Sequence, residues 1–342
     1  MDQQTMPSAA PAPVKQAPSS LALWANLAVV YVIWGSTYFG IAIAIKTMPP
    51  FLMAAIRFAL AGLILLAWDL VRHPEARRLP TRRQVLDSAI VGGLLLGIGN
   101  GFVVFGEKTV PSGIAAILIG MMPLWFAVLG WLYLRQKLPR LVVFAVALGF
   151  VGVALLIWPA GDGANHFDPF GIFILFLAPL GWAHGSIYSV QRAKLPRSPL
   201  TASGFQMLAG AAVTGIESLI AGEPAHFDPS AISAESVIAV VYLILFGSML
   251  AYTAYAWLLR NAPLSLVGTY AYVNPVVAVG LGTIFLHEPI SARTIIAAAV
   301  IILAVAIIVT ARGRLAGAAA RDVAGAGAHD EQQRLGAKPA RS

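Results

Sequence analysis

Charged side chains are scarce in this sequence: Asp, Glu, Lys and Arg together supply only 11% of its 342 residues. A typical soluble domain carries about a quarter charged residues and under half apolar ones, whereas 58% of the residues here are hydrophobic. A soluble chain of this composition could not cover its apolar interior with polar surface, and the mean hydropathy of +0.79 agrees. The shortage of charge excludes a soluble globular enzyme and predicts an integral membrane protein.

Cysteine is absent altogether, which excludes disulfide bonds, thiolate catalysis and cysteine-based zinc or iron–sulfur sites. The sequence also lacks a phosphate-binding loop and a Gly-x-Gly-x-x-Gly motif that opens a helix. His287-Glu288 is followed by Pro289 and by no second His four residues on, so it is not a zinc-protease motif. We therefore expect no enzymatic activity, no cofactor and no metal site.

Long apolar runs take the place of charge. Crossing a bilayer requires about 20 mostly apolar residues, and ten segments of the chain meet this requirement. Strands are excluded because the runs are too long for a soluble core strand and show no inward–outward alternation. We predict an all-α integral membrane protein with ten transmembrane helices. The segments are about 21–45, 51–70, 86–105, 113–134, 141–158, 170–190, 203–221, 237–259, 265–286 and 294–311.

The two ends of the chain differ from this apolar middle. Residues 1–20 are rich in Pro and Ala, and residues 312–342 are rich in Ala, Gly and Arg, so both are expected to be disordered tails. The apolar run 21–45 is too long for the core of a signal peptide, and we expect it to stay in place as the first span.

The basic residues predict the orientation. With both termini in the cytoplasm, 19 of the 23 Lys and Arg residues fall on the cytoplasmic side and three on the other, while Arg57 lies inside a span. The positive-inside rule therefore predicts a multi-pass protein of the cell inner membrane with cytoplasmic termini. The formal net charge of +8 reflects this topology. We expect the lipid bilayer, and not nucleic acid, as the partner of these charges.

The two halves of the apolar region, 21–158 and 170–311, look alike. Three landmarks recur 152 residues later: Pro111 as Pro263, Pro123 as Pro275 and Gly130 as Gly282. Two more recur 148 residues later: Trp34 as Trp182 and Lys46 as Lys194. Each half holds five predicted spans, an odd number, so the second copy enters the membrane from the opposite side. Inverted repeats of this kind are typical of alternating-access secondary transporters, whose binding site lies near the midplane between the copies.

Several groups of residues follow one another in a recognisable order. The run 31–39 (YVIWGSTYF) precedes Pro49-Pro50-Phe51 and Arg57-Phe58; later come 110–116 (VPSGIAA), Met122-Pro123-Leu124 and 270–279 (YAYVNPVVAV). In order and spacing they resemble EamA-type transporters of the drug/metabolite transporter superfamily, over residues 21–311. The resemblance implies ten helices in two copies, a cavity drawn from spans 1, 3, 4, 6, 8 and 9, and export of a small organic solute.

The resemblance is interrupted at one place. The family usually closes the fourth span of the first copy with a Gly-Glu-type pair, where this sequence has Arg135-Gln136. The second copy keeps His287-Glu288. If this acid takes part in energy coupling, only the second copy supplies it.

Aromatic and amide side chains within the spans are expected to line the cavity with apolar bodies and polar tips. Asn100 can instead close a helix–helix hydrogen bond. Pro123 and Pro275 either kink their helices for packing or free backbone carbonyls for a ligand. The candidate substrate-binding residues are Trp34, Tyr38, Asn100, Pro123, Trp182, His184, Tyr188, Tyr252, Tyr270, Asn274 and Pro275.

Ionisable side chains within the spans are a second group of candidates. Arg57 lies about six residues into the second span, where it either contacts an anionic group in the cavity or pairs with backbone carbonyls or an acid. Glu217 is expected at a similar depth, near the outer end of the seventh span. His184, the only His within a span, either carries a coupling proton or is a neutral packing residue.

The sequence therefore predicts a secondary transporter that moves a small organic metabolite or drug-like solute across the inner membrane. Because no nucleotide-binding motif is present, an ion gradient (the proton is the candidate ion) or the solute's own gradient must supply the energy. The alternatives are an intramembrane enzyme acting through His184 or a Ser, a lipid-handling protein and a channel-like facilitator. The Gly-rich third span packs either within the bundle or between the subunits of a homodimer.

Overall fold

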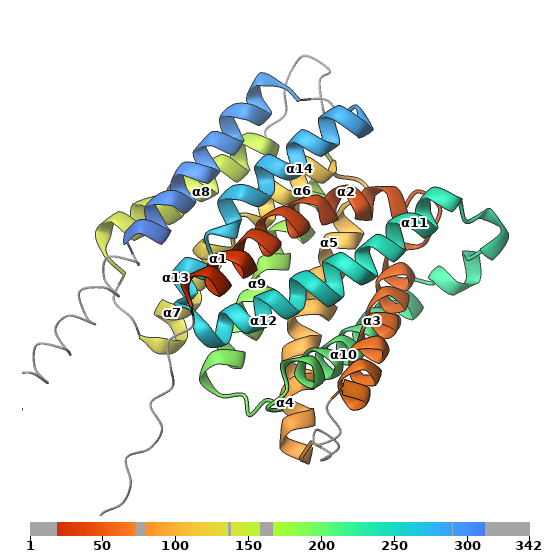
Figure 1. The fold of residues 1–342 in the computed structure, drawn as a ribbon. Coiled ribbons are helices and arrows are strands. Elements are labelled where there is room, and N and C mark those ends of the chain that lie inside the picture. The colour runs from red at the N-terminus through yellow and green to blue at the C-terminus, as the bar shows by residue number, and fades with distance from the viewer. Residues whose placement is uncertain (1–18, 73–79, 136–137, 158–166, 289, 312–342) are drawn as a thin grey trace, which may run out of the picture.

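The computed structural model describes residues 19–72, 80–135, 138–157, 167–288 and 290–311. These residues form helices joined by short connections, and no strand occurs among them (Figure 1). The prediction of an all-helical chain is confirmed. Gln136 and nearly all of the two predicted tails lie outside the described residues.

Several helices follow one another without a break, because α-helical and π-helical stretches alternate within one rod. The first such rod is Ser20–Ala44, the third predicted span is Arg82–Gly106, and the eighth is Ala234–Asn261. The elements are α1 (Ser20–Val29), the π-helix η1 (Val30–Trp34), α2 (Gly35–Ala44), α3 (Pro50–Arg72), α4 (Arg82–Gly92), the π-helix η3 (Gly93–Asn100), α5 (Gly101–Gly106), α6 (Ser112–Ile119), α7 (Met122–Leu134), α8 (Arg140–Ile157), α9 (Pro169–Gln191), α10 (Pro199–Ile220), the short 3-10 turns η4 (Glu223–His226) and η5 (Pro229–Ala231), α11 (Ala234–Tyr242), the π-helix η6 (Leu243–Ala251), α12 (Tyr252–Asn261), α13 (Leu264–Val267), α14 (Tyr270–Leu286) and a final helix Ala292–Ala311.

Seven helices in the described part of the chain are long and apolar enough to cross a membrane: Ser20–Ala44, Pro50–Arg72, Arg82–Gly106, Ser112–Tyr133, Pro169–Gln191, Ala234–Asn261 and Ala292–Ala311. Two shorter helices, α8 and α14, are also apolar, and α10 occupies the predicted seventh span. Each of the ten predicted segments therefore falls on helical structure. The fourth and ninth are interrupted by a turn, after Ile119 and after Val267 respectively.

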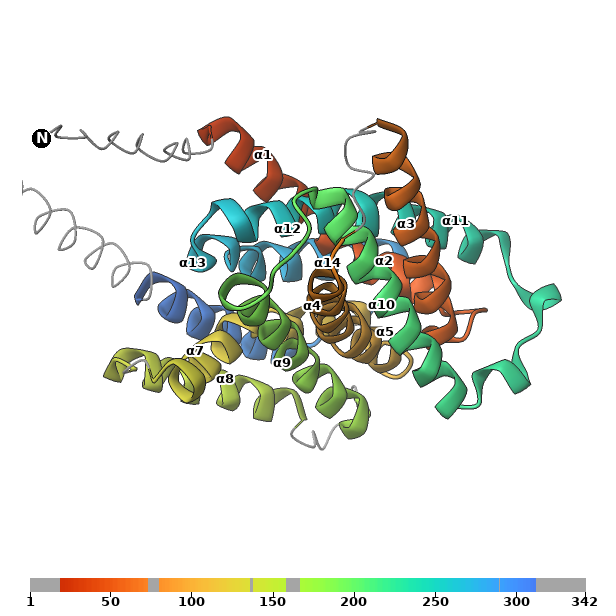
Figure 2. The same ribbon diagram turned by 90° about the horizontal axis from the view of Figure 1, so that it is seen from below.

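The helices of the two halves pack mainly against each other. α3 lies along α10 (Figures 1 and 2), η3 and α5 pack on α9, α11 packs on α2, and α14 packs on α2 and α6. The pattern is symmetric under exchange of the halves, because the third span packs on the sixth as the eighth packs on the first. Both halves therefore contribute to one continuous core.

Glycines allow α10 to approach its neighbours closely. A Cβ atom on Gly92 would overlap the backbone carbonyl of Gln206, and a Cβ atom on Gly97 would lie 2.6 Å from Val213 Cβ. On Gly101 it would collide with the carboxylate of Glu217. The Gly-rich third span thus packs against α10 of the same chain, so its small residues serve contacts within the bundle.

Buried acids of the second half cap helix ends of the first. Glu223 accepts hydrogen bonds from the first amides of α3, those of residues 51 and 52, at 3.2 and 2.8 Å. Glu288 accepts from the amides of Ser112 and Gly113, at the start of α6, at 2.8 and 3.1 Å, and from the Ser112 hydroxyl at 2.7 Å. A helix N-terminus needs such acceptors because its first amides have no partner within the helix. The acid considered for coupling in the sequence therefore serves as a helix cap.

Acids of the first half form the reciprocal contacts. Asp87 accepts hydrogen bonds from the Tyr188 hydroxyl at 2.6 Å and from the Lys194 amide at 2.7 Å, which ties the start of α4 to the end of α9. Asp69 accepts from the hydroxyl of Thr201 in the first turn of α10. Carboxylates thus link the two halves in both directions.

Two helices end in the same unusual conformation. Arg135 after α7 and His287 after α14 have φ angles of 50° and 55°, the only positive values at non-glycine residues in the described chain. Their amides bond to the carbonyls of Gly130 and Gly282. All these positions correspond by the 152-residue displacement, so the two copies share the turn as well as the landmarks.

Replacing Gly92 by Ala tests the close packing of α4 on α10. The new methyl group would overlap the Gln206 backbone, which cannot rotate away, so we expect a loss of about 3 kcal/mol or more in folding free energy. Gly280→Ala is the matched control, because nothing lies within 4 Å of the added carbon and alanine favours a helix by about 1 kcal/mol over glycine. Thermal unfolding midpoints in detergent compare the two. Equal midpoints would contradict the packing described.

Candidate functional site

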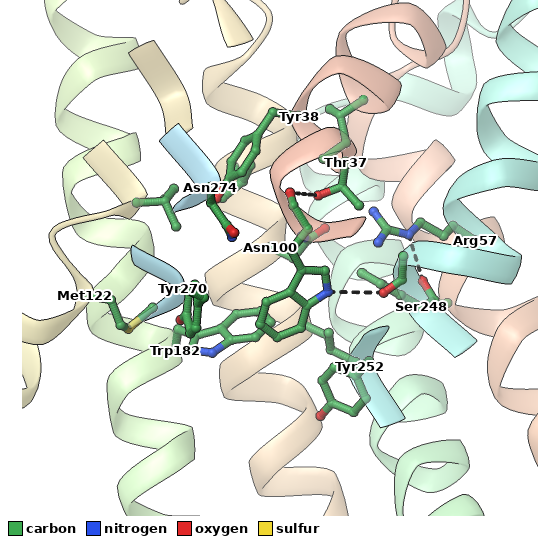
Figure 3. A pocket seen from close by; sticks show the side chains of 17 residues that line it. Thr37, Tyr38, Arg57, Asn100, Met122, Trp182, Ser248, Tyr252, Tyr270 and Asn274 are labelled. Carbon is green, nitrogen blue, oxygen red and sulfur yellow. Dashed lines mark hydrogen bonds between the residues drawn. The ribbon is translucent and has the colours of Figure 1, made fainter. Parts of the chain in front are cut away.

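A cavity of about 50 Å³ lies where helices of both halves meet (Figure 3). Its walls come from the first four predicted spans and from the sixth, eighth and ninth. The second span, through Arg57 and Phe58, joins the set implied by the family resemblance. The lining residues are Trp34, Thr37, Tyr38, Ile41, Arg57, Phe58, Leu96, Asn100, Val103, Ile119, Met122, Trp182, Gly247, Ser248, Tyr252, Tyr270 and Asn274.

Aromatic rings form one side of the cavity. The ring centroids of Trp34 and Trp182 lie 5.2 Å apart in an edge-to-face arrangement, and Trp34 is also 4.8 Å from Tyr255 and 5.5 Å from Tyr270. Edge-to-face contacts of this kind are favourable because the positive ring edge meets the negative ring face. The two tryptophans that correspond by the 148-residue displacement therefore meet at this site.

The polar tips of these rings are used to join helices. The Trp34 indole nitrogen donates to the Gly247 carbonyl at 3.2 Å, and the Tyr252 hydroxyl donates to Gln206 at 2.7 Å. A buried indole or phenol needs such a partner, since an unpaired polar group is costly away from water. The aromatic wall thus presents mainly its apolar faces to the cavity.

Arg57 is the charged member of the lining, and only 3% of its surface is exposed. Its Nε donates to the Ser248 hydroxyl at 2.8 Å (Figure 3), and its guanidinium lies over the Phe58 ring, 5.0 Å from the centroid. Gly247 leaves room for it, since a Cβ atom there would lie 3.0 Å from Nη2. No hydrogen bond or ion pair joins Arg57 to Glu217 among the described residues.

Two polar atoms at the cavity have no hydrogen-bond partner in the described chain: Nη1 of Arg57 and the amide oxygen of Asn100. Asn274 differs, because its amide nitrogen faces the carbonyls of Tyr31 and Tyr270 at 3.0 and 3.3 Å. A buried donor and a buried acceptor without partners cost free energy unless a ligand completes them. The cavity is therefore prepared to receive both an acceptor and a donor.

All three π-helical stretches contribute to the lining. η1 carries Trp34, η3 carries Leu96 and Asn100, and η6 carries Gly247 and Ser248. η3 and η6 occupy corresponding places in the two copies. Widened helical turns of this kind occur frequently at functional sites, because they re-aim side chains and carbonyls without ending the helix.

The profile of the EamA-like transporter family matches the chain twice, over residues 21–158 and 169–310. The chain belongs to the EamA-like transporter family. Its members include proteins named as transporters, and the resemblance seen in the motifs is thereby confirmed.

Relatives support this membership. The chain is 40% identical over 290 residues to the inner membrane transporter YedA of Escherichia coli strain K12, covering 84% of this chain and 90% of that protein. It is 27% identical over 268 residues to the protein PecM of Dickeya dadantii, covering 77% and 84%. A solved crystal structure at 21% identity superposes with a TM-score of 0.60 over 87% of this chain and 99% of that chain, a likeness of fold.

Eight of the residues predicted for an EamA-like site line the cavity: Trp34, Tyr38, Arg57, Asn100, Trp182, Tyr252, Tyr270 and Asn274. The prolines stand next to it. Pro123 falls in the first turn of α7, where a missing amide costs nothing, and Pro275 packs near Gly120.

Three other predicted residues are placed elsewhere. His184 contacts Tyr133, with 2.9 Å between its Nε2 and the hydroxyl, and it is not among the lining residues. Tyr188 bonds to Asp87 at the end of α9. Glu217 lies beside Gly101, and its Oε2 has no hydrogen-bond partner in the described chain.

The lining also includes polar or adaptable residues that the sequence argument did not select, among them Thr37, Met122 and Ser248. Met122 could have been found, because it corresponds to Asn274 by the 152-residue displacement. Nothing in the sequence marks Thr37 or Ser248, which depend on where the π-helical turns fall.

The variant Ser248→Ala tests the anchoring of Arg57. It would leave the Arg57 Nε–H buried without an acceptor, so we expect a loss of about 1–3 kcal/mol in stability. Ser88→Ala is the control: its hydroxyl is buried and has no hydrogen-bond partner among the described residues, so its removal should be neutral or stabilising. Unfolding midpoints measured in the same detergent decide, and a Ser248→Ala protein as stable as Ser88→Ala would refute the anchor.

Proposed function

We propose that this protein is a secondary transporter that binds a small organic solute in the cavity between two inverted five-helix copies. The observation that carries the proposal is the meeting of Trp34 and Trp182, corresponding residues of the two copies, in one cavity. Inverted-repeat transporters place their substrate between the copies, near the midplane of the bilayer. Membership of the EamA-like transporter family agrees with this mechanism.

The helix packing supports ten spans arranged as two inverted copies. α3 and α10, the second and seventh predicted spans, pair directly, as do α6 and α14 in the fourth and ninth. Such self-paired contacts are expected on a pseudo-two-fold axis. The distribution of Lys and Arg supports cytoplasmic termini and an inner-membrane location.

The size of the cavity supports alternating access. Pockets for drug-sized ligands usually have volumes of about 300–1,000 Å³, and this cavity has about 50 Å³. A solute must therefore bind in a more open conformation, in which helices of the two halves have moved apart on one side. The conformation described here is the closed one of such a cycle.

The cavity chemistry favours a solute with an apolar body and a carboxylate, such as an amino acid. Arg57 Nη1 can donate to a carboxylate oxygen, and the Asn100 amide oxygen can accept from an ammonium or hydroxyl group. The aromatic wall around Trp34 suits the apolar part. Export is the direction that the family resemblance implies, driven by an ion or solute gradient.

The alternative of an intramembrane enzyme has less support. Its proposed base, His184, contacts Tyr133 away from the cavity. Ser248 lies in the cavity, but its hydroxyl accepts from Arg57 and has no base beside it in the described chain. A lipid-handling protein or a channel-like facilitator would differ in kinetics: saturable counterflow argues against a channel, and absence of lipid scrambling argues against the former.

The variant Arg57→Gln tests the solute class. In inside-out vesicles supplied with a mixture of amino acids and other metabolites, the wild type should accumulate carboxylate-bearing solutes. Loss of one charge-assisted hydrogen bond, worth about 1.5–3 kcal/mol, should raise the half-saturation concentration about tenfold or more. Arg72→Gln, at the exposed end of the same helix, is the matched control and should behave as the wild type. Equal uptake by both variants would exclude Arg57 as the carboxylate contact.

A second variant, His184→Ala, separates transport from the alternatives that use this residue. Because the imidazole is not part of the cavity lining, we expect flux and its dependence on a proton gradient to stay at the wild-type level. The same vesicle uptake assay, run with and without the gradient, provides the measurement. A loss of flux would return His184 to the functional set.

A further inference from the structure

Glu107 is an isolated buried acid. It follows Gly106, the last residue of the apolar span Arg82–Gly106, and only 7% of its surface is exposed. Neither carboxyl oxygen has a hydrogen-bond partner in the described chain. Other buried acids differ: Glu223 and Asp87 each accept several hydrogen bonds. Those acids serve as caps and ties, whereas Glu107 has no such structural task.

Glu107 lies on the same helical face as the cavity. Leu96, Asn100 and Val103 of this span line the cavity, and Glu107 follows at the next helical interval, four residues after Val103. The cavity-facing stripe of the third span therefore ends in this acid. Its burial means that the cavity is closed at the Glu107 end in this conformation.

The charges around Glu107 come from several elements. Arg57 on α3 attracts a negative charge there, while Glu288, after α14, repels it. Tyr38 on α2 senses the same carboxyl group. The neighbouring Lys108 lies over the ring of Phe105, 5.5 Å from its centroid.

The remaining acids nearby are engaged elsewhere or point to another helix. Asp168, at the start of α9, accepts from Thr109 at 2.9 Å and caps its own helix. Glu217 on α10 lies beside Gly101 at the start of α5. Arg57 is thus the cation that acts on Glu107, and its Nε is already bonded to Ser248.

A carboxyl group without water or donors is more stable in its neutral form, because its negative charge has lost solvation. Burial raises the pKa of Glu107 well above its usual range, Glu288 raises it further, and Arg57 opposes both. The neutral form therefore belongs to the closed conformation. Opening of this end would restore water and favour the charged form.

We propose that Glu107 is the proton-binding site of this transporter, protonated while its end of the cavity is closed and ionised when that end opens. Proton binding and opening are then linked, since any ligand that prefers one conformation shifts the equilibrium toward it. The inference rests on the proposed transport function and names its coupling ion. It assigns the coupling role to Glu107 in place of His184.

Infrared pH titration of the protein in lipid vesicles tests the proton site without any solute. The wild type should show a protonated-carboxyl stretching band at neutral pH that disappears in Glu107→Gln. Glu235→Gln, a matched change of an exposed acid, should retain the band. Persistence of the band in Glu107→Gln, or its loss in Glu217→Gln instead, would overturn the proposal.

The conservative variant Glu107→Asp covers the case in which the glutamine variant does not fold. It keeps a carboxyl group but moves it by one methylene, so the band should remain with a displaced midpoint. A band with an unchanged midpoint would place the proton on another residue and overturn the assignment.

Transport in proteoliposomes tests the coupling itself. With a mixture of the standard amino acids and an imposed proton gradient, Glu107→Gln should lose gradient-driven accumulation and keep solute exchange. Gradient-driven accumulation equal to that of the wild type would overturn the coupling role. A wild type that shows the Glu107 band but moves none of these solutes would instead contradict the proposed transport while supporting the proton site.

Discussion

The structure depends on one constraint: helix ends inside the bundle need partners, and lipid offers none. The partners are carboxylates of the opposite half. Glu223 and Glu288 cap helices of the first copy, while Asp87 and Asp69 bind groups of the second. The two copies therefore cannot be completed separately, and the cavity at their junction is shaped by the same contacts that hold the fold together.

Chemical selectivity follows from how few polar atoms at the cavity lack partners. The indole of Trp34 and the hydroxyl of Tyr252 are engaged between helices, while Arg57 Nη1 and the Asn100 amide oxygen are not. A solute can therefore be distinguished by its own donor and acceptor, against an apolar background. The π-helical turns make this possible, because they direct Asn100, Gly247 and Ser248 toward one volume without breaking the helices that carry them.

Composition and periodicity predicted the helices well, since apolar length alone identifies a span and the repeat landmarks locate Trp34 and Trp182. The angular position of a residue around its helix was harder to predict. His184 shares its helix with Trp182 yet contacts Tyr133. The role of Glu288 as a cap and the isolation of Glu107 depend on contacts between distant helices. Single-sequence patterns contain no signal for such contacts, and π-helical turns have no sequence signature either.

The matching turns at Arg135 and His287 have a further consequence. A left-handed conformation costs a residue with a side chain about 1 kcal/mol, yet both copies retain it while the residues themselves have diverged. The bend that leads from one helix to the next is thus better preserved than the chemistry placed on it. In this chain the backbone angles keep a record of an ancestral gene duplication that the side chains at these two positions have lost.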